Sequence, residues 1–320
     1  MTVLIQILLI LFHVLVFPGF LFVFVCGLLL AGIDRKILAR MQKRVGPPLL
    51  QPFYDFFKLM GKETIIPDAA NKAVYRIAPI AGLASLVVTM NFIPVFSFSS
   101  FSFSADIIVI IYLLTIPAVA LIVGGSSSGS PFAGVGISRE MVTMISYELP
   151  LILILLAVAK KAGGAELCFS LSGIVAWQQS TYLGIAHWSL IPAALAMLLV
   201  IPAEVGTQPF DTAEAETEIC EGPLIEYSGA PLGVFKLNTA IKMFIMTSLF
   251  TCLFLGGIDT GIVALNALIL FAIDAGLTIL CMTFIHAVTA RLKIEHLFKF
   301  YWTIVSGLAL LSLILVWIGL

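Results

Sequence analysis

Eight long apolar runs dominate the sequence, and shorter polar segments separate them. The runs lie at roughly 3–32, 77–98, 107–123, 141–159, 185–201, 237–255, 262–288 and 300–320. An α-helix rises ~1.5 Å per residue, so about 20 apolar residues cross the ~30 Å hydrocarbon layer of a bilayer. We therefore predict an all-α, polytopic membrane protein with about eight transmembrane helices. Residues 1–320 are expected to form a single transmembrane domain.

The composition agrees with this pattern. Hydrophobic residues make up 61% of the chain and charged residues only 11%, whereas about a quarter of a soluble domain is charged. No basic residue precedes the first run, which is also longer than the apolar part of a typical secretory signal. We expect this first run to be retained as a membrane helix.

Basic residues are distributed unevenly between the two sides of the predicted membrane protein. With eight crossings, segments 33–76, 124–140, 202–236 and 289–299 share one side, and with Lys242 they contain 15 of the 17 Lys and Arg residues. Only Lys160 and Lys161 lie on the other side. The positive-inside rule places the basic side in the cytoplasm and both termini outside, in a plasma (cytoplasmic) membrane.

The first cytoplasmic segment, 34–76, contains the amphipathic stretch GPPLLQPFYDFFKLMGKETIIP. Its aromatic residues recur at three- and four-residue spacing and its charged residues fall on the opposite side, which predicts a helix that starts near Pro52 and ends near Gly61. Such a helix lies in the membrane interface. It could serve only as a lipid anchor, or its aromatic face could form a floor for a soluble partner.

A second cytoplasmic segment, 202–236, is acidic. Residues 202–231 contain seven acids and no Lys or Arg. Asp211 with Glu214 suits a helix start and Gly222-Pro223 a stop, which predicts a short helix over 212–221 with several acids on one face. Like charges at this spacing repel, so helix stability does not explain them. A solvated loop is one interpretation; a cation or proton entry funnel, or a docking surface for a basic partner, better explains acids without a counter-ion.

Four carboxylates lie in or beside the predicted membrane helices. Glu140 and Glu148 are about two turns apart on the fourth helix, Glu204 ends the fifth and Asp274 is near the middle of the seventh. A charged side chain at the bilayer centre costs ~2.5–3.5 kcal/mol or more, so such groups face protein or water and are candidate proton carriers. The alternatives are structural: Glu148 could hydrogen-bond a neighbouring helix, and Asp274 could pair with a polar group on the next one.

Other chemistry is not indicated. The five cysteines are far apart without a C-x-x-C pair, so no iron–sulfur, zinc or disulfide framework is predicted. No nucleophile–base pair, phosphate loop or nucleotide fingerprint is present, and we expect neither a bound metal nor a nucleic-acid partner. The chain is not evidently a complete enzyme.

Several ordered motifs carry a family resemblance. They are D-R-K at 34–36, M-Q-x-R-x-G-P at 41–47, L-L-Q-P-F-x-D at 49–55, I-S-Y-E at 145–148, P-F-D at 209–211, E-Y-S-G-x-P at 226–231 and R-L-K-I-E-H-L at 291–297. In this order they resemble subunit 1 of respiratory complex I. The resemblance spans the chain from the first helix to the last.

The resemblance implies an adaptor that lies under a soluble electron-transfer arm and connects it to antiporter-like membrane subunits. The resemblance implies roles for Glu148, Glu204, Asp211 and Glu226. Together with the acids that the pattern indicates, Glu140, Glu214, Glu218 and Asp274, they form the expected charge or proton relay. The expected partner-docking residues on the predicted floor are Arg35, Lys36, Arg40, Arg44, Gln51, Phe53, Asp55 and Lys58. Redox cofactors would belong to partner subunits.

Three departures from the quinone-reducing branch point to a different reaction. Pro48 leads straight to Leu49 where that branch has a longer, glycine-containing segment; Gly206-Thr207-Gln208 replaces Asn-Arg-Ala; and Asp34 replaces Glu. The compact form is similar to the membrane anchor of energy-converting, membrane-bound [NiFe] hydrogenases of the archaeal type. That similarity implies hydrogenase-like large and small subunits with a NiFe centre and iron–sulfur clusters, and ferredoxin as electron donor.

Three alternatives stay open. The same anchor could serve a complex that reduces sulfur or polysulfide, or a quinone-reducing complex I. The chain could also be a self-sufficient ion transporter, although this would leave the acidic and aromatic cytoplasmic segments unexplained. The coupling ion, proton or sodium, is not decided by any motif.

Overall fold

The computed structural model describes residues 2–95, 101–164, 166–256 and 259–319. Eight helical segments within them are long and apolar enough to cross a membrane: Leu8–Met41, Lys72–Phe92, Asp106–Ser127, Pro131–Gly163, Trp188–Val205, Gly229–Leu255, Val263–Val288 and Ile294–Ile318. The prediction of an all-α protein with about eight membrane helices is therefore confirmed.

The principal helices are α1 (Thr2–Leu15), α2 (Phe20–Met41), α3 (Gln51–Met60), α4 (Lys72–Phe92), α5 (Asp106–Ser127), α6 (Pro131–Gly163), α7 (Leu171–Ser180), α8 (Ile191–Val205), α9 (Glu216–Ile219), α10 (Gly229–Leu255), α11 (Val263–Thr278), α12 (Phe284–Val288), α13 (Ile294–Phe300) and α14 (Ser306–Ile318). Two π-helical turns, Ile279–Thr283 and Tyr301–Val305, join α11 to α12 and α13 to α14. The first turn explains why the sequence predicts α11 and α12 as one run over 262–288. Helix α13, by contrast, lies almost wholly in the segment 289–299 that the sequence predicts as a loop, so that prediction is wrong.

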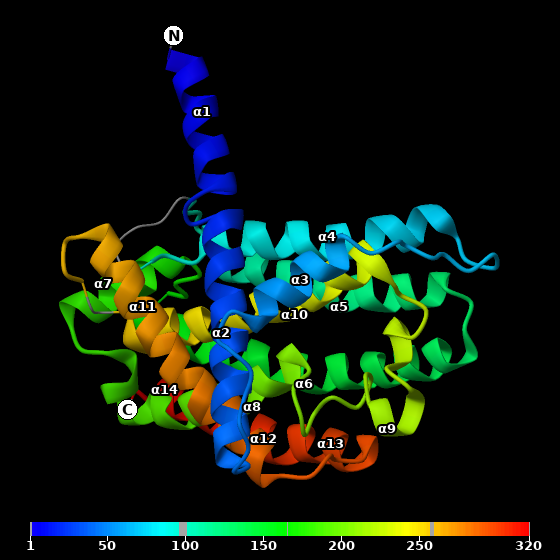
Figure 1. The fold of residues 1–320 in the computed structure, drawn as a ribbon. Helices are drawn as coiled ribbons and strands as arrows, with labels where there is room; N and C mark the ends of the chain where they lie inside the picture. Colours follow the sequence, from blue (N-terminus) through cyan, green and yellow to red (C-terminus); the bar gives the residue numbers. More distant parts are fainter. Residues whose placement is uncertain (1, 96–100, 165, 257–258, 320) are drawn as a thin grey trace.

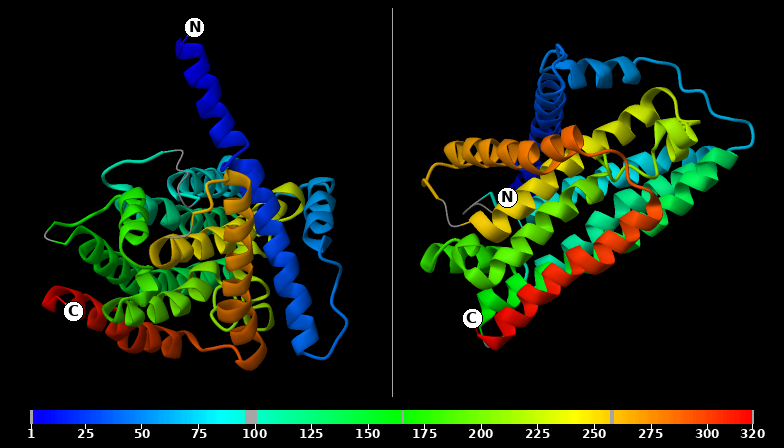
Figure 2. Two further views of the ribbon diagram at one scale, coloured as in Figure 1. Left: turned by 90° about the vertical axis from the view of Figure 1, so that its left-hand side faces the viewer. Right: turned by 90° about the horizontal axis from the view of Figure 1, so that it is seen from below.

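A bundle of α4, α5, α6 and α10 lies side by side, and α2 crosses it at a steep angle, with α1 projecting beyond the bundle (Figure 1). Figure 2 shows α14 running along α6 at one side of this bundle. Helix α10 is the most enclosed of the spanning helices, with 94% of its apolar window buried. Polar residues on α10 are therefore packed against protein rather than lipid.

The N-terminal run differs from the prediction of one helix over 3–32. It is broken between α1 and α2 next to Pro18, which has no backbone N–H to continue a helix. Helix α2 then continues through Met41, so the first part of the predicted 34–76 loop is helical. Lys and Arg are good helix formers and are favoured near helix C-termini, which explains the extension.

The predicted amphipathic helix is α3, and it begins and ends where the sequence indicates, with Pro52 in its first turn and Gly61 as its C-cap. The rings of Phe53 and Phe56 pack against Phe24 of α2 at centroid distances of 5.9 and 5.3 Å. Phe57, by contrast, is 61% exposed. One part of the aromatic face thus packs against α2, and the other part is exposed.

The acidic segment departs most from its prediction. The expected helix over 212–221 is wrong, because only α9 (Glu216–Ile219) is helical there. Cys220, Glu221 and Gly222 have positive φ angles of 52°, 66° and 49°, which end the helix. Upstream, the Thr212 hydroxyl lies 3.1 Å from that of Thr143 on α6. Tertiary anchoring therefore overrides the local capping signal.

The ten-residue helix α7 was not predicted.

Candidate proton-relay site

The segments that carry the sequence motifs meet at one end of the bundle, which we call the loop junction. The Ile65 amide donates to the Ser228 hydroxyl (3.0 Å), and the Leu292 amide donates to the Pro209 carbonyl (3.2 Å). The Asn71 amide donates to the Ser127 carbonyl (3.0 Å). These bonds join all four segments that the sequence predicts to share one side of the membrane.

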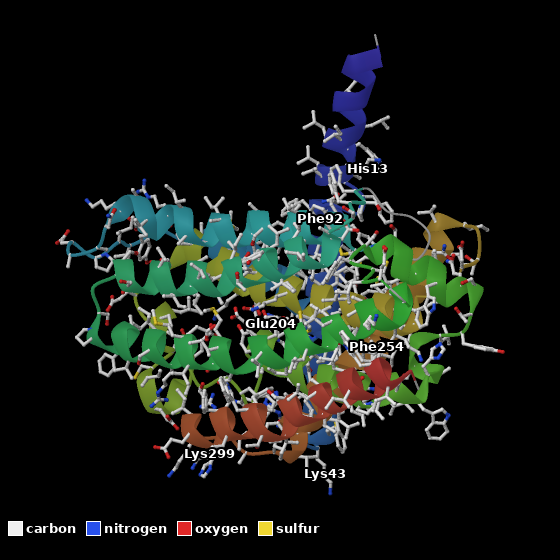
Figure 3. The ribbon with its side chains drawn as sticks, turned by 180° about the vertical axis from the view of Figure 1, so that it is seen from behind. His13, Lys43, Phe92, Glu204, Phe254 and Lys299 are labelled. Atoms are coloured by element: carbon white, nitrogen blue, oxygen red, sulfur yellow. The ribbon has the colours of Figure 1, made fainter. Side chains whose placement is uncertain are left out.

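A buried ion pair joins α8 to α10. The Lys242 ammonium lies 2.8 Å from a Glu204 carboxylate oxygen, and both side chains are almost fully enclosed. Glu204 lies near the middle of the molecule, whereas Lys43 and Lys299 lie at its edge (Figure 3). The ring of Tyr147 on α6 lies 5.9 Å from the same ammonium. Lys242 thus neutralises one carboxylate deep in the protein.

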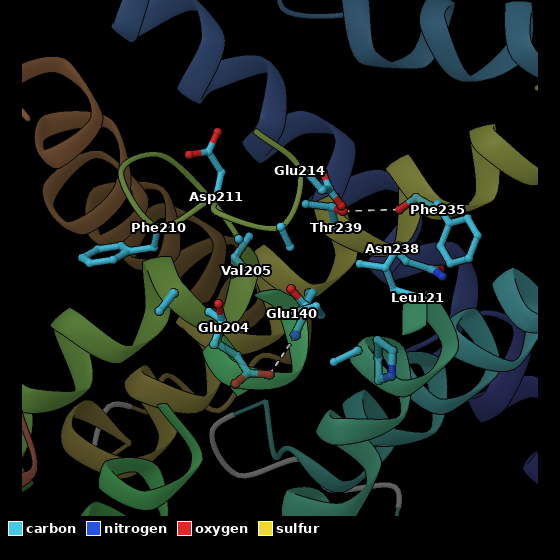
Figure 4. Close-up of a pocket in the computed structure, with 17 residues that line it drawn as sticks. Leu121, Glu140, Glu204, Val205, Phe210, Asp211, Glu214, Phe235, Asn238 and Thr239 are labelled. Carbon is cyan, nitrogen blue, oxygen red and sulfur yellow. Dashed lines mark hydrogen bonds and ion pairs between the residues drawn. The ribbon is translucent and has the colours of Figure 1, made fainter. Parts of the chain in front are cut away.

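A cavity of about 60 Å³ adjoins this ion pair. Glu140 of α6, Glu204 of α8, and Asp211 and Glu214 of the acidic segment come together around it (Figure 4). Lys242 is the one basic side chain that lines it among the described residues. Negative charges on these carboxyl groups repel one another, and such repulsion favours the protonated form of some of them. The site is therefore suited to holding protons.

Two cavity-lining residues each have a buried polar atom without a partner in the described part of the chain. One carboxylate oxygen of Asp211 and the amide oxygen of Asn238 are buried and have no hydrogen-bond partner among the described residues. Both side chains line the cavity. A water molecule needs about 10–15 Å³ of such volume and a few polar partners, so the cavity has room for more than one. Water there could transfer protons between the carboxyl groups.

Glu214 belongs to the acidic segment and lines the cavity from that side. Burial raises its pKa, and the neighbouring Glu140, Glu221 and Asp211 charges raise it further, while Lys236 lowers it. The result is a pKa of about 7 instead of 4.5. At neutral pH this carboxyl group can both bind and release a proton, which a relay group requires.

The acidic segment does have counter-ions, so the prediction that its seven acids lack them is wrong. Asp211 accepts hydrogen bonds from Arg291 Nη2 (2.8 Å) and Nε (3.1 Å). Glu218 pairs with Arg139 at 2.5 Å. These cations come from α6 and from the segment before α13. They lie far away in the sequence, which explains why the segment looks unpaired there.

The remaining predicted relay residues lie apart from the cavity wall. Glu148 is half-buried on α6, within electrostatic reach of Glu204 and Lys242. Glu226 is outside the cavity lining, beside Tyr75, whose hydroxyl donates to the Glu226 carbonyl (2.7 Å). Asp274 is fully buried and accepts hydrogen bonds from Ser248 (2.5 Å) and Thr251 (2.8 Å) on α10. For Asp274 this is the structural pairing that the sequence leaves open.

The predicted docking residues lie on α2, on α3 and, for Arg44, in the connection between them. Arg35 and Gln51 both donate to Asp55, at 2.9 and 3.0 Å. Partial burial alone would raise the pKa of Asp55, but these hydrogen bonds and the charges of Arg35 and Lys58 outweigh it and lower that pKa. Arg40 and Arg44 are exposed beyond this cluster and Lys36 is half-buried. Their contact with a partner stays a prediction.

Sequence reasoning missed the three cations that organise the site: Lys242, Arg139 and Arg291. Lys242 counted only as a flanking positive charge. The sequence did contain a signal for Lys242: it lies inside an apolar run, and a lysine buried there requires an acidic partner, such as the acids predicted on neighbouring helices. Among the described residues, no group of three or more His, Cys, Asp or Glu could hold a metal ion.

The fold and the buried charges define a polytopic membrane protein of the complex I-like type. The family model described as NADH dehydrogenase matches residues 12–317. The chain therefore belongs to the NADH dehydrogenase subunit 1 family, and it is an integral multi-pass membrane protein. The predicted family is confirmed.

Proteins of several complexes are similar to this chain. The chain is 38% identical to hydrogenase-4 component C of Escherichia coli (71% of this chain, 70% of the relative) and 32% identical to its formate hydrogenlyase subunit 4 (88% and 92%). It is also 32% identical to the corresponding membrane chain of the NADH-quinone oxidoreductase of Rhizobium rhizogenes (92% and 90%). A chain of the archaeal membrane-bound sulfane sulfur reductase superimposes with a TM-score of 0.84 at 28% identity, covering 92% of this chain and 96% of that one.

Proposed function

We propose that this chain is the membrane anchor and coupling subunit of a ferredoxin-driven, ion-translocating hydrogenase complex. The carboxyl cavity around Lys242 is the observation that carries the proposal, since the acidic segment that lines it also forms part of the loop junction. The similarity to hydrogenase-4 component C supports the hydrogenase assignment. So does the short connection from α2 to α3, in which Pro48 is followed directly by Leu49.

In this proposal the chain carries no redox centre. A hydrogenase-like large subunit with its NiFe centre, and a small subunit with iron–sulfur clusters, dock on the loop junction and on α3, from the cytoplasm. A change of charge at the docked redox centre alters the proton affinity of Glu214, and the change is passed through the cavity to Glu140 and Glu204. Antiporter-like membrane subunits then move the ion.

A second candidate is the same role in a sulfur- or polysulfide-reducing complex. The structural similarity to the sulfane sulfur reductase chain favours it. The cavity and its charges would act in the same way, because the reduced substrate belongs to the partner subunits.

Co-purification distinguishes the candidates. The chain is tagged, extracted with its partners in mild detergent, and the associated proteins are identified by mass spectrometry. A large subunit with two complete C-x-x-C pairs and antiporter-like partners would support the hydrogenase. The same set with those cysteines incomplete would support sulfur reduction, a bound quinone would support a complex I, and a chain without partners would contradict an anchor role.

A further inference from the structure

A second cavity, of about 220 Å³, lies between α2, α3 and α10. Helix α3 crosses α10 beside α2 in Figure 1, and this crossing encloses the cavity. Gly233 of α10 permits the close approach, since a Cβ atom there would lie 3.2 Å from the Leu59 Cβ of α3. The cavity is separate from the carboxyl site and shares no lining residue with it.

The wall of this second cavity has two chemically distinct parts. Its apolar part includes Leu28, Phe56 and Leu237. Its polar part has four basic side chains and one acid: Arg35, Lys58, Lys62, Lys236 and Asp55. Asp55 is already paired with Arg35 at 2.9 Å. The excess positive charge therefore belongs to the three lysines.

We infer that this cavity binds an anionic phospholipid, with its phosphate against Lys58, Lys62 and Lys236 and an acyl chain along the apolar wall. An amphipathic helix such as α3 lies at the depth of the lipid headgroups, where a phosphate is available. Basic pockets between membrane helices on the cytoplasmic side are suited to anionic headgroups. A soluble anion would not use the apolar wall, and a neutral apolar molecule would not use the lysines.

Bound lipid would fix the position of α3. This helix contacts α2 through its aromatic rings and α10 at Gly233, with the cavity between these contacts. A phospholipid that fills the space would join the three helices through charge on one side and packing on the other. This inference does not depend on which reaction the parent complex catalyses.

The test uses the purified complex after its lipid has been removed in mild detergent. The complex is titrated with phosphatidylglycerol or with phosphatidylcholine, and native mass spectrometry counts the bound lipid molecules. We expect tight binding of phosphatidylglycerol alone. In a Lys58→Glu/Lys62→Glu variant its affinity should fall at least about thirtyfold, since each basic residue near the headgroup contributes substantially to anionic-lipid binding. Thermal unfolding shows whether the variant is folded.

A Lys43→Glu/Lys72→Glu variant is the matched control, because it makes the same change in net charge with two exposed lysines outside the cavity. Its affinity for phosphatidylglycerol should change less than about twofold. Equal losses in both variants would mean that only the general surface charge attracts lipid. The inference would also be overturned if phosphatidylcholine bound as tightly as phosphatidylglycerol or if the complex retained no lipid. Recovery of a molecule without phosphate from this cavity would overturn it as well.

Discussion

At the residue scale, Lys242 decides the charge balance of the carboxyl cavity. Glu140, Glu204 and Glu214 line the same cavity, and Lys242 pairs with Glu204. No basic side chain among the described lining residues is left for the other two, and like-charge repulsion favours their protonated forms. Moving the lysine or a proton by a few ångströms would change which acid is charged.

Replacing Lys242 by methionine tests this balance. Methionine has similar length and no charge, so Glu204 would be left buried without its counter-ion. Removing one partner of a buried pair costs ~3–5 kcal/mol. We expect a lower thermal unfolding midpoint for Lys242→Met in detergent, and recovery of most of the loss in Lys242→Met/Glu204→Gln. A double variant as unstable as the single one would show that the ion pair does not set the balance.

Glu214 gives a second test, through pH. Its pKa in the folded protein is about 7, against an ordinary 4.5. Between these values the folded state holds a proton that the unfolded state has released, so stability falls as pH rises through this window. Below it both states are protonated, and above it the full penalty applies. The unfolding midpoint should therefore decrease from about pH 4.5 to about pH 7.

Glu214→Gln should flatten this part of the pH profile. Glutamine resembles the protonated carboxyl group, so the variant should match the wild type at low pH and exceed it above about pH 7. Glu226→Gln is the matched control, because that side chain does not line the cavity. If both variants keep the wild-type slope, Glu214 does not titrate in this range.

At the element scale, the acidic segment forms the lid of the cavity by packing directly on α6. Gly136 allows this contact, since a Cβ atom there would lie 2.5 Å from Pro223 Cδ and 3.0 Å from the Ala213 carbonyl oxygen. Ala213 and Glu214 are cavity-lining residues. A side chain at position 136 would therefore move the lid away from the bundle.

Gly136→Ala should destabilise the protein by ~1–3 kcal/mol, the usual cost of overpacking. Gly134→Ala is a matched control two residues earlier on α6, where a Cβ atom would have no neighbour within 4 Å. Alanine is favoured over glycine inside a helix, so the control should be neutral or slightly stabilising. Unfolding midpoints of both variants compare these outcomes directly. A stabilising Gly136→Ala would contradict the close contact.

The elements that the sequence could predict are those with a strong local signal. The eight apolar runs and helix α3 have the length, periodicity and terminal residues of their structures. The helix over 212–221 could not be corrected from sequence, because contacts to α6 and Arg291 hold its first residues out of a helix. The break before α2 was also hidden, since apolar residues continue on both sides of Pro18.

The site was predictable in its acids but not in its assembly. A carboxylate inside or beside an apolar run is conspicuous, and Glu140, Glu204, Asp211 and Glu214 all stand out in the sequence. The counter-ions of Glu204 and Asp211, which are Lys242 and Arg291, come from segments remote in sequence, which no local pattern indicates. Asp274 is equally conspicuous in the sequence, but its hydroxyl partners, Ser248 and Thr251, come from another helix, so the sequence does not separate it from the cavity acids.

At the scale of the whole molecule, the cavity lies between two regions with different proposed partners. The loop junction faces the proposed redox subunits, while α6 continues into the membrane beyond Glu148. Glu140 and Glu148 are eight residues apart, a rise of about 12 Å along the helix. In the proposed relay, Glu148 transfers a proton between the cavity and a neighbouring membrane subunit.

Replacing Glu148 by glutamine tests whether this connection couples the two regions. The side chain keeps its size but cannot exchange a proton, while the loop junction and the Lys242 pair stay intact. In the complex reconstituted into liposomes, we expect the number of ions transported per hydrogen molecule to fall by about tenfold or more, since a positioned proton-transfer group contributes ~10²–10⁴ in rate. Hydrogen evolution in detergent should persist. Glu63→Gln, an exposed carboxyl change in the loop after α3, should leave the ratio unchanged. Full coupling in Glu148→Gln would show that charge leaves the cavity by another path and would remove Glu148 from the relay.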